Sequence, residues 1–291
     1  MRVLAMQLTL LRAPMLRCMS AGASMALLAV VRICWVFAAV ALSAILGPQR
    51  HAHAQTPAPN QDQSWHEKTS TTLEPSGDSW IGAEAFGRVA SLYSGVTWAP
   101  LTSIREDGLR VRVVIGNSTY RYSGPRYDSV SDNAVWQSFT GTARFMDLLA
   151  GWQFTQGSTT VKAFAGYSQL SRHITPFDTE VALQKRLSGV KGAIEIWYNW
   201  SPKLWTSVDL SASRVQSTYA IHLKTGQRIF GDWSLGPEAS LVGTTESTLH
   251  RLGIFARYHG QGDEFTMSGG LARTRGDAPS AYGSAQYLQR F

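Results

Sequence analysis

Five histidines after residue 54 are the side chains best suited to proton transfer: His66, His173, His222, His250 and His259. His173 follows Ser171 and Arg172 at the edge of a long predicted loop, where a histidine that activates a serine hydroxyl would support acyl transfer. The sequence contains neither a G-x-S-x-G elbow nor an H-E-x-x-H zinc pair. Isolated histidines on polar strand faces are usually solvated or hydrogen-bonded locally, so we predict no catalytic residue and no enzymatic activity.

Three carboxylates, Glu195, Asp209 and Glu238, lie within or near predicted strands. Two such groups about 5–9.5 Å apart across a cavity would suit hydrolysis of a glycosidic bond. The alternative is an electrostatic lining, in which acidic side chains pair with basic ones, and we favour it. The basic partners on other segments are Arg110, Arg112 and Arg257.

Aromatic side chains crowd around one predicted turn, and they are Trp197, Tyr198, Trp200 and Trp205. Such rings would stack on sugars, although a belt of aromatic residues at a membrane–water interface explains the same cluster more simply. The candidates for contact with a polymer or for lining a lumen are Glu195, Asp209, Arg110, Arg112, Trp197, Trp200 and Trp205.

Composition excludes several classes of site. Both cysteines, Cys18 and Cys34, precede residue 55, so the rest of the chain has no thiol for a disulfide, a metal or catalysis, and we predict no metal and no cofactor. Residues 1–54 hold five arginines and no acidic residue; without those five, 22 of the 27 basic residues face 20 acidic ones. No basic cluster follows residue 55, which argues against a nucleic-acid partner.

The first 54 residues have the layout of a secretory signal. Arginines precede the uncharged apolar run 33–47, and Ala52-His53-Ala54 then supplies a small-residue cleavage site. The alternative is an uncleaved anchor, although the run is shorter than the ~20 residues that a spanning helix needs. We predict a signal peptide over 1–54, a flexible lead-in over 55–79, rich in Pro, Gln, Ser and Thr, and a folded domain over 80–291.

The folded domain shows period-two alternation of apolar and polar residues, as in Leu109, Val111, Val113 and Ile115, and no sustained helical spacing. This pattern predicts an all-β domain of about twelve strands, with ten to fourteen compatible with the sequence. The predicted segments are 80–88, 90–99, 108–122, 138–155, 159–173, 188–200, 203–213, 216–224, 229–243, 248–259, 264–274 and 281–291.

Three features favour an antiparallel up-and-down membrane barrel over a secreted β-sandwich. Aromatic residues lie near segment ends, the polar faces carry many small residues, and the connections sort by parity. Long connections at 123–137 and 174–187 would be extracellular, whereas short ones at 156–158, 201–203 and 224–228 would be periplasmic, and the connection at 100–107 is a moderate exception. The aromatic residues in question are Trp80, Trp98, Trp152, Phe154, Tyr198, Trp200 and Tyr258.

The last segment ends on an aromatic residue. Tyr287 and Phe291 share one face, which resembles the C-terminal signature of bacterial outer-membrane barrels. Gln289 departs from the apolar residue usual between them, so the match is partial.

Longer stretches resemble the cellulose biosynthesis protein BcsS family. These are WIGAEAFGRVASLYSGVTWAP (80–100), GLRVRVVIGNSTYRYSG (108–124), LLAGWQFTQGSTTVKAFAGYSQLSRHITP (148–176), FGDWSLGPEASLVGTTES (230–247) and HRLGIFARYH (250–259). The most specific element is F-G-x-x-x-x-G-P-E-x-x-x-x-G, from Phe230 to Gly243, with Gly236, Pro237 and Glu238 at its centre. Because proline has no N–H for a central ladder, we expect a bulge or local break at Pro237.

The resemblance implies an outer-membrane barrel associated with bacterial cellulose production, and it transfers no catalytic residue. We therefore predict a non-enzymatic accessory barrel that aids glucan export, secretion or surface organisation. Its expected partners are outer-membrane lipid, glucan and components of the cellulose synthase complex. The alternatives are a barrel enzyme acting on lipid or polysaccharide and a general small-solute porin.

Overall fold

The computed structural model describes residues 75–128, 133–178, 186–245 and 247–291, so the predicted signal peptide and most of the lead-in lie outside the described residues. Their main elements are twelve strands, which confirms the predicted number. The strands are β1 (Gly77–Phe86), β2 (Val89–Trp98), β3 (Gly108–Asp128), β4 (Asn133–Gln156), β5 (Thr159–Thr175), β6 (Leu187–Asn199), β7 (Leu204–Ser213), β8 (Thr218–Phe230), β9 (Trp233–Gly243), β10 (Thr248–His259), β11 (Asp263–Thr274) and β12 (Ser280–Arg290). A single 3-10 turn, η2 (Val215–Ser217), joins β7 to β8.

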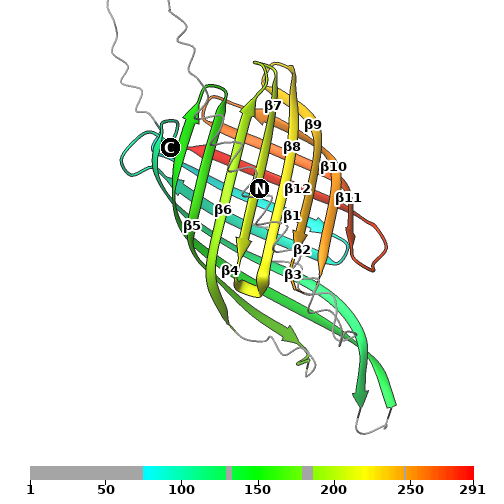
Figure 1. Cartoon of the computed structure of the whole chain (residues 1–291). Helices are drawn as coiled ribbons and strands as arrows, with labels where there is room; N and C mark the ends of the chain where they lie inside the picture. The colour runs from blue at the N-terminus through cyan, green and yellow to red at the C-terminus, as the bar shows by residue number, and fades with distance from the viewer. Residues whose placement is uncertain (1–74, 129–132, 179–185, 246) are drawn as a thin grey trace, which may run out of the picture. The chain divides into compact units, whose positions relative to one another are not determined.

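Each strand pairs antiparallel with its neighbours in sequence, and β1 pairs with β12 to close an up-and-down barrel (Figure 1). The closing register runs from Asp78 opposite Arg290 to Phe86 opposite Tyr282. Phe291 extends the closure, because its N–H donates to the Gly77 carbonyl at 3.0 Å and its own carbonyl accepts from the Gly77 N–H at 2.9 Å. The predicted fold class is thereby confirmed.

The strands bury one face and expose the other, as their period-two sequences require. The exposed outer face is apolar over the middle of the barrel, which is the surface that a bilayer stabilises. Its large side chains include Ile81, Leu92, Val96, Val113, Ile115, Met146, Leu148, Val190, Leu223, Leu235, Leu252, Ile254, Met267 and Leu271. Among the described residues, no helix has the length and apolar character needed to cross a membrane.

The termini end of the barrel, where Gly77 and Phe291 meet, carries several tight turns. Gly157 and Gly231 adopt positive φ values of 56° and 49°, which favour glycine. The turn predicted at 224–228 is wrong, because β8 continues to Phe230 and the chain reverses at Gly231 instead. Gly226 does not turn the chain; a Cβ there would lie 2.4 Å from the Trp205 ring, so glycine makes room for that indole.

The opposite end, here called the hairpin end, is uneven. Most of the 123–137 connection predicted as a loop is strand, because β3 and β4 stay paired from Gly108–Gln153 to Asp128–Asn133. The β2–β3 register stops at Tyr120 and the β4–β5 register at Thr140. The remainder of β3 and β4 therefore extends past the neighbouring strands as a two-stranded projection (Figure 1).

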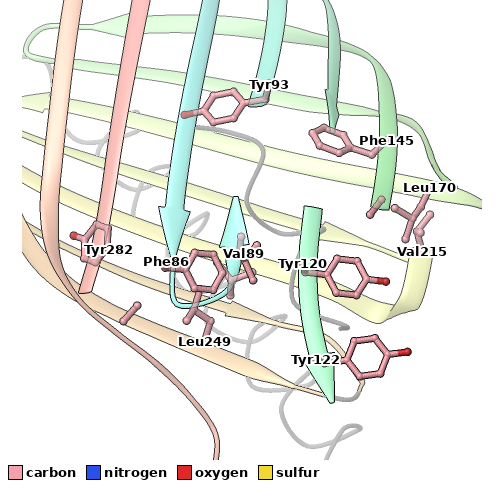
Figure 2. Packing of buried hydrophobic residues seen from close by; sticks show 14 of the residues in the cluster. Phe86, Val89, Tyr93, Tyr120, Tyr122, Phe145, Leu170, Val215, Leu249 and Tyr282 are labelled. Atoms are coloured by element: carbon pink, nitrogen blue, oxygen red, sulfur yellow. The ribbon is translucent and has the colours of Figure 1, made fainter. Parts of the chain in front are cut away.

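Inward-facing hydrophobic residues from many strands pack together near the hairpin end, as Figure 2 shows for Phe86, Val89 and Leu249. Tyr120 and Tyr122 follow each other on β3, with ring centroids 6.2 Å apart. A Cβ on Gly141 would meet the Tyr120 ring at 1.9 Å, so this glycine permits the ring to lie over the neighbouring strand.

Candidate functional site in the barrel lumen

The inward face carries charged side chains that pair with one another between strands that are not neighbours. Arg112 of β3 reaches Glu195 of β6, with Nη1 to Oε1 at 2.6 Å and Nη2 to Oε2 at 3.3 Å. The guanidinium also donates from Nε to Thr97 Oγ1 at 2.9 Å and lies 3.6 Å from the Phe164 ring centroid. Because both charged side chains are almost fully buried, this pair replaces lost hydration with direct hydrogen bonds.

Two further clusters contain buried ion pairs, the first between β4 and β6 and the second between the adjacent strands β8 and β9. Asp147 accepts from Lys191 Nζ and from Ser168 Oγ, each at 2.6 Å. Glu238 accepts from three donors, which are Lys224 Nζ at 2.8 Å, Ser268 Oγ at 3.0 Å and Tyr282 Oη at 2.7 Å.

A fourth pair joins the strands on either side of the barrel closure. Arg251 of β10 lies 3.3 Å from Glu84 of β1 and 4.6 Å from the Phe86 ring centroid. Of the predicted pairings, Glu195 does bind Arg112, whereas Glu238 pairs with Lys224 and Arg257 pairs with Glu264.

An aromatic cluster occupies the lumen near the termini end. Trp197, two residues before the end of β6, stacks on Trp205, the second residue of β7, with centroids 4.2 Å apart and planes at 19°. Arg257 lies 4.6 Å and 4.9 Å from the two ring centroids and pairs with Glu264 at 2.5 Å. Phe255 adds a ring 5.4 Å from Trp205. We call Trp197, Trp205 and Arg257 the lumenal platform.

The four aromatic residues predicted around this turn divide between the two faces of the wall. Tyr198 and Trp200 are exposed, with ring centroids 4.6 Å apart in an edge-on contact. The interfacial-belt interpretation therefore stays a prediction for these two and is wrong for Trp197 and Trp205, whose rings face the lumen. Trp80, also predicted to lie in the belt, is 3% exposed and faces Arg112 in the lumen at 5.8 Å.

Residues 79–291 match the family described as cellulose biosynthesis protein BcsS. The chain belongs to this family. No curated protein sequence is significantly similar to it.

Several solved structures are similar to it in a structural comparison. The KdgM porin in complex with disordered oligogalacturonate is 10% identical, with 74% of this chain and 99% of that chain covered and a TM-score of 0.42. The TodX deltaS2S3 mutant monoaromatic hydrocarbon channel is 8% identical, with 75% and 91% covered and a TM-score of 0.47. The Acinetobacter baumannii outer membrane protein Omp33 is 10% identical, with 75% and 99% covered and a TM-score of 0.38.

The motif predicted to be most specific for the BcsS family lies on β9. A Cβ on Gly236 would lie 1.7 Å from the Thr225 carbonyl oxygen, so only glycine fits this close approach. Pro237 faces outward, and the β8–β9 register is the same on either side of it. The local break expected there is present, because the register gives neither Gly236 nor Pro237 a partner on β8, and a separate register shift lies between Arg228 and Phe230 beside the turn.

Arg110, predicted to line the lumen, instead binds the connection between β2 and β3 in this BcsS barrel. Its guanidinium donates to Thr102 Oγ1 at 3.2 Å and to the Ser103 and Ile104 carbonyl oxygens at 3.2 and 3.3 Å. These bonds hold the connection between β2 and β3 over the termini end. Arg110 is therefore a scaffold for that connection and, being 0% exposed, does not offer its charge to a ligand.

The registers align four lumenal polar residues on adjacent strands: Glu195 opposite Asp209, Asp209 opposite His222, and His222 opposite Ser240. Among the described residues, no hydrogen bond joins His222 to Ser240. His173, the other histidine singled out, is exposed on β5 and lies 3.3 Å from Thr175 Oγ1. Within the same described ranges, no group of His, Asp or Glu side chains is arranged to hold a metal ion.

Sequence reasoning missed Glu84, Asp147, Lys191, Lys224 and Arg251. Each lies at an inward-facing position of a strand with alternating polarity. A single charged residue at such a position is common, so the sequence alone does not single it out. Only the register shows which charges meet, since the paired residues lie up to 167 positions apart.

Proposed function

We propose that this chain is an accessory outer-membrane barrel of cellulose biosynthesis, which contacts the glucan in its lumen and aids its export or surface organisation without catalysis. The observation that carries the proposal is the lumenal platform in a member of the BcsS family. Trp205 is buried and packs between Trp197 and Phe255, so the partly exposed Trp197 indole, supported by Trp205, is the apolar surface suited to the C–H face of a pyranose ring. Arg257 and Glu264 beside them supply the donors and acceptors that sugar hydroxyls need.

The proposed orientation places the termini end in the periplasm. The tight turns at Gly157 and Gly231 support this, because outer-membrane barrels keep short turns on the periplasmic side and longer structures outside. Export through a cleaved signal over residues 1–54 is part of the same proposal. The platform would then meet a glucan arriving from the synthase in the inner membrane.

The absence of catalysis is proposed because the lumenal carboxylates are already engaged. Both oxygens of Glu195 accept from Arg112, and Glu238 accepts from three donors. Hydrolysis of a glycosidic bond needs one carboxyl group that donates a proton and a second that acts as base or nucleophile. Carboxylates held in ion pairs are poorly suited to the first task.

Deletion of the gene in a cellulose-producing strain tests this function. We expect a change in total cellulose or in its division between cells and medium, restored by the wild-type gene. Unchanged cellulose, with other surface polymers altered, would contradict the proposal.

A further inference from the structure

The projecting part of the β3–β4 hairpin carries exposed aromatic side chains on its outer face. Tyr127 is 69% exposed and Trp136 is 74% exposed. The register sets Pro125 opposite Trp136 and Tyr127 opposite Ala134, so the tyrosine and tryptophan are diagonal neighbours on one face. Large exposed aromatic residues grouped in this way mark a contact surface.

This surface lies too far from the membrane to belong to an interfacial belt. The apolar run on the outer face of β4 ends at Met146, ten residues from Trp136. At about 3.4 Å per residue and a strand tilt near 40°, Trp136 stands roughly 26 Å further along the barrel axis. The outward residues between them are polar and are Arg144, Thr142, Thr140 and Ser138. Lipid contact is therefore excluded for this pair.

The other face of the hairpin is held by hydrogen bonds to Asp178, which make the projection rigid. Asp178, just after β5, accepts from Tyr122 Oη at 2.7 Å and from Arg126 Nε and Nη2 at 2.9 and 2.6 Å. Arg126 also lies 4.9 Å from the Phe139 ring, which stacks on Tyr122 with centroids 5.0 Å apart. A surface that is ordered before binding loses little conformational entropy on contact with a ligand.

We propose that the outer face of this hairpin is a second contact surface, which docks a neutral glucan chain outside the cell. Among the described residues, the side chains that flank the aromatic pair on this face are uncharged, and they are Ser123, Pro125, Ala134 and Ser138. An uncharged face matches an uncharged polysaccharide and offers no cation to an acidic polymer or a phosphorylated lipid. The Ser123 and Ser138 hydroxyls, 3.0 Å apart, add hydrogen-bonding groups beside the rings. The identity of the polymer as a glucan rests on the proposed function.

Binding of the full-length protein in nanodiscs to amorphous cellulose particles tests this surface. We expect Tyr127→Ala/Trp136→Ala to weaken binding at least tenfold, and the matched Tyr127→Phe/Trp136→Phe variant to retain it. Heat-modifiable migration on gels checks that each barrel is folded, and Trp136→Lys serves as a single variant should the double one fail that check. Equal binding by wild type and folded alanine or lysine variants would overturn the inference.

Further measurements distinguish the hairpin surface from the proposed function and from surfaces for other ligands. Trp200→Ala should leave particle binding unchanged, because this exposed tryptophan lies on the outer wall at the termini end, away from the hairpin. The gene deletion tests the proposed function separately. A normal cellulose phenotype after deletion would contradict that function without contradicting the binding measured at the hairpin. If polygalacturonate bound as well as cellulose, or if the pair instead mediated a concentration-dependent dimer that Tyr127→Ala/Trp136→Ala abolished, the assignment to a neutral glucan would be wrong.

Discussion

Removing one partner of the Arg112–Glu195 pair should destabilise the barrel strongly. Their side chains are 2% and 9% exposed, so Glu195→Gln leaves the guanidinium with neither its counter-charge nor water. A buried ion pair broken in this way typically costs about 3–5 kcal/mol, and loss of the bidentate contact falls within that range. The Phe164 ring 3.6 Å from the guanidinium cannot substitute for a carboxylate, since a desolvated cation–π contact contributes only about 2 kcal/mol.

Urea unfolding of the refolded barrel in lipid vesicles measures this free energy. Replacing both partners, as Arg112→Leu/Glu195→Leu, should recover most of the loss, because no unpaired charge is left. Asp78→Asn is the comparison, since the Arg290–Asp78 contact at 3.5 Å is longer, its arginine is 20% exposed, and its loss should cost less than the loss of the Arg112–Glu195 pair. A cost below about 1 kcal/mol for Glu195→Gln, with additive effects in the double variant, would show that water solvates the pair and would refute the reasoning.

Other residues give sharper local tests. Gly236→Ala should lower the free energy of unfolding by at least about 2 kcal/mol, because its Cβ would overlap the Thr225 carbonyl, whereas Gly262→Ala, with nothing within 4 Å, should change it by less than about 0.5 kcal/mol. In a complemented deletion strain, Trp197→Ala/Trp205→Ala should lower cellulose output toward the deletion level, and the outward Trp200→Ala should not; equal effects would speak against the platform. His222→Ala/Ser240→Ala should leave cellulose output at the wild-type level when the barrel is present in normal amount, and a fall to the deletion level would argue for catalysis.

The strand pattern was readable because a barrel wall has one apolar and one polar face, which imposes period two on each strand. Turn positions were less certain. Gly226 looked like a turn residue, yet it accommodates the Trp205 ring inside β8. The 123–137 stretch looked like a loop because the projection has no membrane to impose alternation on its outer face.

The lumen was harder to predict for a different reason. Whether Trp197 or Tyr198 faces inward depends on the phase of one strand, and an error of one residue exchanges the two faces. Which charges pair depends on the whole closed register, since Arg112 and Glu195 lie 83 residues apart and on strands that are not neighbours. The sequence indicates a charged lumen lining, but only the closed barrel determines which charged side chains form ion pairs.

Titration of cellohexaose into the purified full-length protein tests the central claim, that the lumen contacts glucan at its platform. The measurement is best made by calorimetry in the Tyr127→Ala/Trp136→Ala background, so that the hairpin does not contribute. We predict saturable binding that Trp197→Ala/Trp205→Ala weakens at least tenfold and that Trp200→Ala leaves unchanged. Binding that is absent, or equally strong without the two lumenal tryptophans, would contradict the account.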